Sequence, residues 1–324
     1  MSPFYRLQIR PTSPWRTPWQ ADTLATLLCW VCVRMYGPEI LRRRILDLTL
    51  AGEPPFVLSD AFPHDWMPIP QTAHLRTWPG NIDRKTIKRC RWLEIESFHQ
   101  VRQGLPVEAD RLYEDPFQQI LQVRNTIDRS TNTSLKEGGL YFLQETTFNS
   151  ANRFSPSLDV YLHVQADFVD MLMALFDELS ATGFGADTSA GRGQFEILGD
   201  FHSVPWLSEP VECPNGSIVL STFQPGPDDP VLGLWESFTK HGKIGPDFGL
   251  ADVRKRPLVL FRPGACFFSH PTKPWVGRAV PMDQLLPDET CGEIRRRHLE
   301  VVHLAFGLAI PAHFNPEDIP CPTM

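Results

Sequence analysis

The sequence lacks an apolar run long enough to cross a membrane. Its longest run, from Leu24 to Met35, is interrupted by Arg34 and falls short of the roughly 20 residues that a spanning helix needs. The opening residues, MSPFYRLQIRPTSPW, do not contain the charged and apolar regions of a secretory signal peptide. We therefore expect a cytoplasmic protein without a membrane partner.

Paired cysteine motifs are also scarce. The chain has seven cysteines, and only Cys29 and Cys32 form a CxxC. That pair lies in an apolar segment with helical spacing and no second CxxC follows, which disfavours a zinc site or a thioredoxin-like redox centre. A chain of 324 residues can bury a sizeable core without metals or disulfides. We expect neither a metal nor a cofactor.

Positive charge is limited as well. The 31 basic residues are outnumbered by 38 acidic ones, and the net charge of −7 excludes a polybasic nucleic-acid coat. Local basic patches stay open, because 24 of the basic residues are arginine and only seven are lysine. Arginine suits planar, bidentate contacts to phosphate, although a GC-rich genome produces the same bias.

The chain has neither a Rossmann fingerprint nor a Walker loop. Its glycine-rich run, GFGADTSAGRG at 183–193, leads from a predicted helix into a predicted strand, the reverse of a dinucleotide-binding turn. Backbone amides, a hydroxyl and a guanidinium can still form a phosphate-binding concavity there, and the competing interpretation is a mobile connector. Because Arg192 is expected on a flexible loop rather than in a core, Arg192→Ala should weaken phosphate binding there without disturbing the fold. The candidate residues are Gly183, Gly185, Ser189, Gly191, Arg192 and Gly193.

Hydrophobic periodicity predicts an α+β chain. Strands are expected over residues 5–9, 158–164 and 194–198. Helices are expected over residues 167–180 and 21–36, the latter ended by Gly37-Pro38. The order over residues 4–200 is β-α-β-β-α-β, the split βαβ pattern of ferredoxin-like domains, which is also the scaffold of RRM domains. Fold alone assigns no function.

After about Val204 the sequence changes to short predicted strands separated by turns, which indicates a second domain. Residues 1–204 form the ferredoxin-like domain, which carries an irregular, proline-rich insertion at about 52–117 and a long hairpin at 118–148. Residues 205–324 form a second, smaller α+β domain. Within it we expect strands at 217–223, 257–262, 265–269 and 275–281, and a last apolar segment at 301–314.

The predicted hairpin has an unusually long polar tip. Residues 124–138 separate its strands, whereas hairpin loops usually have two to five residues, and such outliers are commonly functional or disordered. The tip offers stacking, hydrogen-bonding and wedging groups to an unstacked base. Asp128 is expected to order the turn by pairing with one of the flanking arginines. The candidate binding residues here are Arg124, Asn125, Ile127 and Arg129.

Several motifs together resemble a known family. A glycine-rich loop that follows the second helix of a ferredoxin-like domain and ends G-x-G-x-F, here at 191–195, is the hallmark of the RAMP superfamily of CRISPR–Cas proteins. Five segments in order are similar to blocks of the fourth Csm subunit of type III-A effector complexes. They are ADTLATLLCWVCVRMYG at 21–37, RNTIDRSTNTSLKEGGLYF at 124–142, HGKIGPDFG at 241–249, GACFF at 264–268 and HLAFGLAIP at 303–311.

The resemblance implies two ferredoxin-like, RRM-like domains that hold the 5′ repeat-derived tag of a crRNA. It implies no catalytic role for this subunit. The partners that it implies are the crRNA, the large polymerase-like subunit and the adjacent RAMP backbone subunit. The resemblance makes the candidates of the glycine-rich loop and of the hairpin tip expected RNA-binding residues, together with Lys243, which lies in the block at 241–249.

Two enzymatic classes stay open as alternatives. Some RAMP proteins are metal-independent endoribonucleases that process CRISPR precursor RNA, a reaction that needs a general base near the 2′-hydroxyl and an acid at the leaving oxygen. His64, His74 and His99 are available, but none has a partner at a recognisable spacing. A free-standing nucleotide-binding enzyme is disfavoured by the missing Rossmann and Walker motifs.

Overall fold

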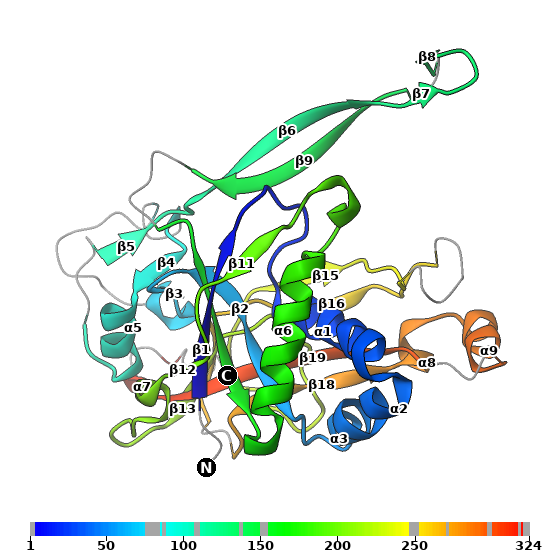
Figure 1. Cartoon of the computed structure of the whole chain (residues 1–324). Helices are drawn as coiled ribbons and strands as arrows, with labels where there is room; N and C mark the ends of the chain where they lie inside the picture. The colour runs from blue at the N-terminus through cyan, green and yellow to red at the C-terminus, as the bar shows by residue number, and fades with distance from the viewer. Residues whose placement is uncertain are drawn as a thin grey trace, which may run out of the picture.

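The protein is a mixed α/β structure built around two antiparallel sheets (Figure 1). The computed structural model describes residues 4–74, 85, 89–106, 111–135, 139–149, 155–245, 253–269, 272–296, 300–316 and 319. A long hairpin projects from the body that the two sheets form. Among the described residues, no helix is both long and apolar enough to span a bilayer.

The first sheet has the strand order β11-β1-β10-β2, and each pair in it is antiparallel. Along the chain its elements follow as β1-α1-β2-β10-α6-β11, and the short strand β12 also pairs with β1. The predicted helices and strands at 5–9, 21–36, 158–164, 167–180 and 194–198 all form. The bounds are β1 (Phe4–Pro11), α1 (Ala21–Tyr36), β2 (Phe56–Pro63), β10 (Leu158–Val164), α6 (Val169–Thr182), β11 (Phe195–Ile197) and β12 (His202–Ser203).

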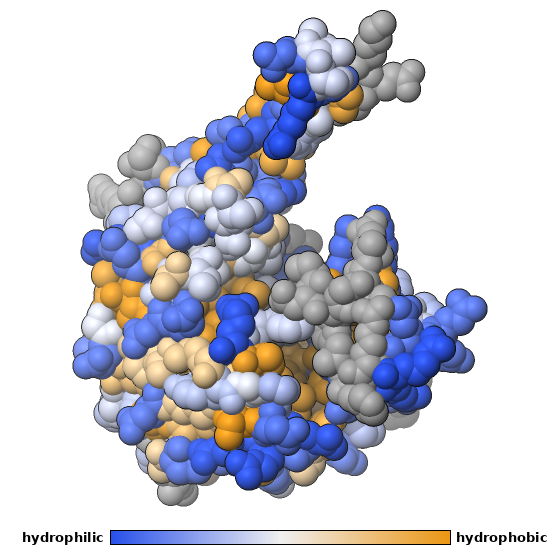
Figure 2. Space-filling model, turned by 45° about the vertical axis from the view of Figure 1, so that its right-hand side comes forward, coloured by the Kyte–Doolittle hydropathy of each residue, from blue (hydrophilic) through white to orange (hydrophobic). Residues whose placement is uncertain are grey.

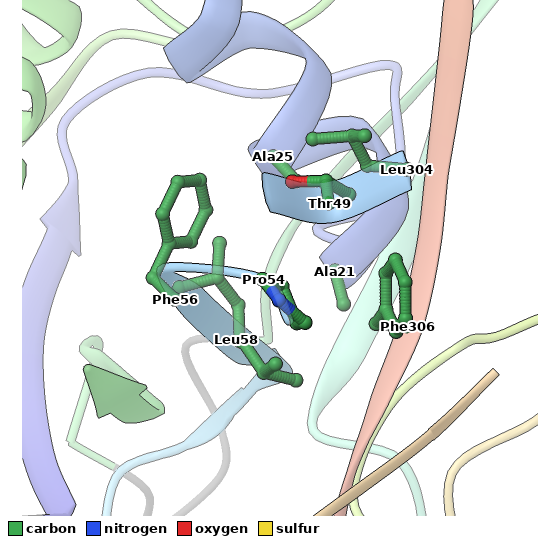
Figure 3. A pocket seen from close by; sticks show the side chains of 9 residues that line it. Ala21, Ala25, Thr49, Pro54, Phe56, Leu58, Leu304 and Phe306 are labelled. Carbon is green, nitrogen blue, oxygen red and sulfur yellow. The ribbon is translucent and has the colours of Figure 1, made fainter. Parts of the chain in front are cut away.

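Helices α1 and α6 pack on one face of this sheet. Leu28 of α1, Leu175 of α6 and Val160 of β10 belong to the same buried cluster. Helix α1 begins at Ala21, whose N–H donates to Asp60 Oδ1 over 2.8 Å. A void of about 20 Å³, room for one water, lies between α1, β2 and the last strand (Figure 3). Packing in this layer is therefore nearly complete.

Strand β2 lies within the segment that the sequence analysis assigns to an irregular insertion. All of its residues are buried, because its two faces meet different neighbours. Phe56 and Leu58 pack in the cluster under the helices, whereas Val57 and Phe62 pack toward the second sheet. Its register against β10 also shifts near the middle. A strand buried on both faces shows no apolar–polar alternation, so periodicity does not reveal it.

The second sheet has the order β14-β17-β13-β19-β18. Its longest strand, β19, pairs with β13 on one side and with β18 on the other. Leu308 of β19 shares a buried cluster with Val57 and Tyr161 of the first sheet, so the two sheets have a common core. A domain boundary at 204 stays a prediction. The bounds are β13 (Gly216–Val219), β14 (Gly233–Leu234), β17 (Ala265–Phe267), β18 (Trp275–Pro281) and β19 (Val302–Ala312).

Short elements surround these sheets. A two-stranded ribbon of β15 (Ser237–Lys240) and β16 (Leu258–Phe261) shares a third buried cluster with α8 (Met282–Leu285) and α9 (Asp288–Arg296). The remaining turns of helix are α2 (Pro38–Leu41), the π-helical η1 (Arg42–Leu46), α3 (Asp47–Leu50), α7 (Pro205–Ser208), and the 3-10 turns η4 (Ala166–Phe168) and η5 (Thr188–Ala190).

The rest of the expected insertion contains a small sheet of its own. The strands β3 (Trp66–Pro68), β4 (Trp92–Glu94) and β5 (Leu112–Tyr113) pair in that order, and they are accompanied by η2 (Gln71–His74) and α5 (Ile95–Arg102). Arg102 is fully buried and donates to the carbonyl oxygens of Pro311, Trp206 and Glu209 over 2.8, 2.6 and 2.6 Å. This arginine fixes the inserted unit to the second half of the chain.

The predicted hairpin is present. Strands β6 (Phe117–Asn125) and β9 (Leu140–Phe148) pair along their whole length, and a smaller ladder of β7 (Ile127–Asp128) and β8 (Thr133–Ser134) lies at the tip. The hairpin stands clear of the body (Figure 1).

Candidate nucleic-acid interface

The glycine-rich loop between α6 and β11 closes on itself. Gly183, Gly185, Gly191 and Gly193 all have φ between +66° and +85°, a conformation that favours glycine. Phe184 N donates to Gly193 O over 2.8 Å, and a Cβ added at Gly193 would overlap the Phe184 carbonyl oxygen. The glycines are therefore required by the loop's own backbone.

The segment that follows β1 holds this loop in place. Arg16 forms an ion pair with Asp187, and Trp19 stacks on Phe184 with ring centroids 3.9 Å apart. Ser189, in contrast, is exposed on the outer side. A loop pinned along one side differs from the mobile connector that the sequence also allowed.

Arg192 is tied to the base of the hairpin. Its Nε donates to Glu145 Oε1 over 2.6 Å, and Glu145 on β9 is fully buried. Arg124 of β6 approaches the same oxygen, with Nη2 3.9 Å from Oε1. The expectation that Arg192 sits on a loop free of core contacts is wrong, because its side chain is only 18% exposed and neutralises a buried carboxylate. Two arginines predicted from separate motifs thus meet at one residue.

Aromatic packing, which no sequence motif indicates, anchors the hairpin. Trp15 and Thr146 exchange both backbone hydrogen bonds, over 3.0 and 2.7 Å. The Trp15 ring lies edge-on to Phe117 and Phe148, with centroids 5.6 and 5.8 Å away. The stem is therefore fixed at its base even though its far end is free of the body.

The turn at the hairpin tip is ordered by Asp128. Its Oδ1 accepts hydrogen bonds from the hydroxyl and the N–H of Ser130, over 2.6 and 2.8 Å, and these bonds lower the pKa of Asp128. Among the described residues its hydrogen-bonding partner is this serine rather than a flanking arginine, which corrects the expected pairing. Exposed on the tip are the candidates Asn125, Ile127 and Arg129.

One face of the hairpin stem is apolar and uncharged. The register pairs Leu121 with Gln144 and Val123 with Phe142, which places these four side chains on the same side. Leu121, Val123 and Phe142 are each more than half exposed. Arg124 belongs to the alternate face, where it approaches Glu145. The stem thus presents one uncharged face and one charged face.

Lys243 lies apart from the hairpin, at a groove between α1 and the β15–β16 ribbon. The groove has a volume of about 740 Å³, within the range of ligand sites. Gly185 and Ala186 line it as well, so the glycine-rich loop and Lys243 border the same groove. Figure 2 shows this face of the molecule hollowed below the projecting hairpin. The predicted residues therefore form two groups, one at the tip and one around the groove.

A buried charged cluster lines the groove. Lys240 Nζ donates to both carboxylate oxygens of Asp22, over 2.8 and 2.7 Å, and His303 Nε2 lies 3.1 Å from Asp22 Oδ2. Burial opposes the ionisation of Asp22, but His303 and Lys240 outweigh it and lower the pKa of Asp22 to about 2. No sequence motif points to this cluster, because Asp22 is more than two hundred residues away from both Lys240 and His303.

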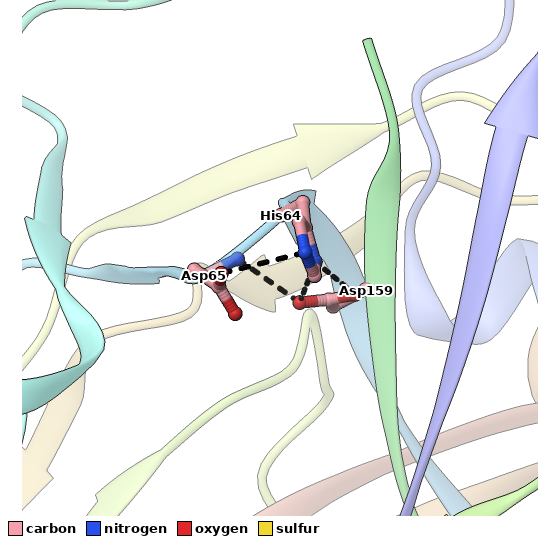
Figure 4. A group of neighbouring side chains, drawn as sticks. All are labelled: His64, Asp65 and Asp159. Atoms are coloured by element: carbon pink, nitrogen blue, oxygen red, sulfur yellow. Dashed lines mark hydrogen bonds and ion pairs between the residues drawn. The ribbon is translucent and has the colours of Figure 1, made fainter. Parts of the chain in front are cut away.

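A second polar cluster contains His64, for which sequence spacing offers no partner (Figure 4). His64 Nδ1 lies 3.0 Å from both oxygens of Asp159, and this hydrogen bond raises the pKa of His64. Asp65 Oδ2 lies 3.4 Å from His64 Nε2, and Arg6 Nη1 lies 3.1 Å from Asp65 and 3.6 Å from Asp159. Although the imidazole and the two carboxylates are close enough to share a metal, a protonated His64 and Arg6 would neutralise both. The donor set fits an ion-pair network.

Comparison with known proteins gives structural matches only. The sequence matches no family model and no curated protein. A chain of the Csm1–Csm4 cassette crystallised with cA4 aligns with a TM-score of 0.60 and 16% identity, over 97% of this chain and 99% of the other. A chain of the Csm3–Csm4 subcomplex of the type III-A CRISPR–Cas interference complex aligns with a TM-score of 0.61 and 13% identity, over 96% and 100%. Csm4 is the subunit common to both assemblies. The chain has a Csm4-like fold.

The Csm4-like fold agrees with the resemblance found in the sequence. It spans almost the entire chain, including segments that carry none of the five quoted motifs. At 13–16% identity the structural alignment establishes a shared arrangement of the backbone. The roles of individual residues around the hairpin and groove remain predictions.

Proposed function

We propose that the chain is the subunit of a type III-A Csm complex that holds the 5′ repeat-derived tag of the crRNA. It joins the large polymerase-like subunit to the first RAMP backbone subunit. One observation carries the proposal: near-complete alignment with a chain solved together with Csm1 and with a chain solved together with Csm3. A protein with this fold that contacts both kinds of partner connects them.

The proposed RNA contacts are divided between the two groups of residues. An unpaired strand needs backbone donors, cations and surfaces on which bases stack or wedge. At the tip, Arg129 supplies the cation, Asn125 an amide and Ile127 an exposed apolar wedge. At the loop, Ser189 offers an exposed hydroxyl, whereas the N–H of Gly191 already donates to Thr188 O over 3.0 Å, so this glycine contributes through the backbone conformation that it allows. Arg124 and Arg192 set the angle between these groups through Glu145, and Lys243 extends the contact toward the groove.

We also propose that both halves are ferredoxin-like RAMP domains. The first sheet supports this through its strand order and through α1 and α6 on one face. The second half keeps an antiparallel sheet of different order, with its helices α8 and α9 between β18 and β19. The two halves pack through a common core, so the proposed boundary near 204 separates topological units.

We infer that the subunit has no catalytic role. The rival function, metal-independent cleavage of precursor RNA, requires an acid and a base that face the substrate. His64 is the histidine with the strongest carboxylate partnership, yet its ring nitrogens face Asp159 and Asp65. Purified chain should leave repeat RNA intact with or without divalent metal. Cleavage at one repeat position, lost in His64→Asn, would favour the nuclease instead.

The proposal is tested by purifying the chain through an affinity tag after co-expression with a large Csm subunit, a Csm backbone subunit and a repeat–spacer array from the same source. We expect both subunits to copurify with RNAs that share one 5′ end, because the tag has a fixed sequence. Sequencing the bound RNA determines its 5′ ends directly. Copurification without RNA of a defined 5′ end would contradict the tag-holding role.

A further inference from the structure

The groove beside α1 contains a cation without a counter-ion. Lys255, just before β16, lines the groove, and among the described residues its ammonium group makes no hydrogen bond or ion pair. Burial lowers the pKa of Lys255 to about 8; Asp22 opposes this shift and Lys240 adds to it. Because Lys240 already binds both oxygens of Asp22, that pair neutralises itself. The positive charge of Lys255 is left over.

A second unpaired group lies in the same place. His303, on β19, is 5% exposed and lines the groove, and its Nδ1 has no hydrogen-bonding partner among the residues that the structure describes. Its Nε2 faces Asp22, which leaves Nδ1 as the free side of the ring. Buried polar atoms without a partner are uncommon in folded proteins and call for an explanation. Burial and the neighbouring lysines lower the pKa of His303, so Nδ1 carries a lone pair in the free chain and becomes a donor only when an adjacent anion favours protonation of the ring. Among the described residues, an ammonium group without a counter-ion and an imidazole that an anion would charge lie in one cavity, and together they indicate a missing anion.

The surroundings of these two groups narrow the chemistry of that anion. The charged lining consists of Arg42, Lys240, Lys243, Lys255 and Arg256 against Asp22, Glu39 and Glu300, with His241 and His303 in addition. The rest of the wall is largely apolar, with Leu27, Val33 and Leu258 among its residues. A ligand that suits both parts has an anionic group and a flat, weakly polar body. The volume of about 740 Å³ admits a group of that size.

We propose that this groove binds the phosphate group of a nucleotide, with Lys255 and His303 as its ligands and the apolar wall beside the nucleoside. With the His303 ring protonated in the bound state, Nε2 donates to Asp22 and Nδ1 donates to the phosphate, whose other oxygens accept hydrogen bonds from Lys255 and from a rim cation. A free nucleotide and an RNA strand present the same group. The inference therefore stands on the groove itself and does not require the proposed function.

Calorimetric titration of the isolated full chain tests this inference. The probes are AMP and, separately, a short single-stranded RNA with a 5′ phosphate. We expect one of them to bind with one-to-one stoichiometry and Lys255→Gln to weaken that binding at least about tenfold, as expected for loss of a charged partner. The matched control is Arg254→Gln, which removes a neighbouring exposed charge outside the groove lining and should bind like the unaltered protein.

A second readout uses the unaltered protein and so avoids any effect of substitution on folding. The titration of Lys255, followed by NMR of isotopically methylated lysines, should move upward from about pH 8 when the probe binds, because an anion favours the charged form. Binding of AMP identifies a free nucleotide as sufficient, and binding of the RNA alone identifies a strand. Absence of binding by both probes, equal binding by Lys255→Gln, or an unmoved Lys255 titration would overturn the inference. None of these results bears on assembly of the complex, which is measured separately.

Discussion

Arg192 and Glu145 form a buried ion pair, with Nε 2.6 Å from Oε1, between two segments that are 47 residues apart in the sequence. Arg192 ends the glycine-rich loop, and Glu145 belongs to the stem of the hairpin. The pair therefore sets the position of one candidate RNA-binding element relative to the other. Arg124, 3.9 Å from the same oxygen, adds a second positive charge on the hairpin side.

Arg192→Ala should destabilise the fold, because it leaves Glu145 buried with only the more distant Arg124 as a counter-charge. Breaking a buried pair costs about 3–5 kcal/mol, and the contact with Arg124 favours the lower end. Urea unfolding measures the change in the free energy of unfolding. The double variant Arg192→Ala with Glu145→Gln should recover part of the loss. An unchanged unfolding midpoint in the single variant would show that the pair contributes nothing.

The His64 cluster should make stability depend on pH near neutrality. Asp159 raises the pKa of His64 above its unfolded value of 6.5. The resulting stabilisation is fully present below about pH 6.5 and is lost as the pH rises through the folded pKa. Besides Asp159, the charged groups that contact His64 or its carboxylates are Asp65 and Arg6.

The free energy of unfolding, measured between about pH 5.5 and pH 9, should therefore fall over that interval more steeply in the unaltered protein than in His64→Gln. Parallel profiles for the two proteins would show that His64 has the same pKa folded and unfolded.

The Asp22 cluster should make the free energy of unfolding depend on pH in the acidic range. The pKa of Asp22 is lowered from 3.8 to about 2, so its stabilisation is present above about pH 4 and is lost as the pH falls toward 2. At neutral pH, Asp22→Asn should destabilise by about 3–5 kcal/mol, because it leaves Lys240 without its carboxylate. Combining it with Lys240→Met should restore part of the loss. Thermal and urea unfolding of the single and the double variant, compared with the unaltered protein, measure both changes.

Shortening the hairpin tip should separate folding from assembly. The backbone and side-chain bonds of Thr126, Asp128 and Ser130 that the structure describes stay within residues 126–139, at the far end of the hairpin. Replacing residues 126–136 by a short Gly-Ser turn should therefore leave the thermal midpoint nearly unchanged and impair assembly on crRNA. In the free subunit the tip should be cut readily by protease, and assembly should protect it. Normal assembly by the shortened protein would make the tip a passive loop.

Hydrophobic periodicity predicted the helices and strands that carry apolar residues on one side and more polar residues on the other. Residues 21–36 and 158–164 follow clear periods, and α1 and β10 form there. It failed at β2, where Val57 and Leu58 are buried on opposite faces and nothing alternates. The described residues of that proline-rich region form β2 and the short strands of a small sheet.

The candidate site likewise contains some residues that the sequence predicted and others that only the structure revealed. Local motifs identified Arg124 and Arg192, because a glycine-rich loop and a long hairpin tip are visible in a single stretch of sequence. Their partner Glu145, and the contacts of Asp22 with Lys240 and His303, depend on how distant segments pack. A single sequence contains no spacing from which such pairs follow, so the charged lining of the groove emerged only from the structure.

The central claim is that the hairpin tip lies against the tag of the crRNA, and photo-crosslinking in the assembled complex tests it most directly. A benzoylphenylalanine placed at Ile127, which is 56% exposed, is compared with one at Val231, which is 87% exposed and lies outside the proposed RNA-binding elements. The account predicts that the Ile127 probe crosslinks to crRNA at or next to the repeat-derived tag, and that the Val231 probe does not. Crosslinking of the Ile127 probe to protein alone, or to RNA no better than the Val231 probe, would contradict it.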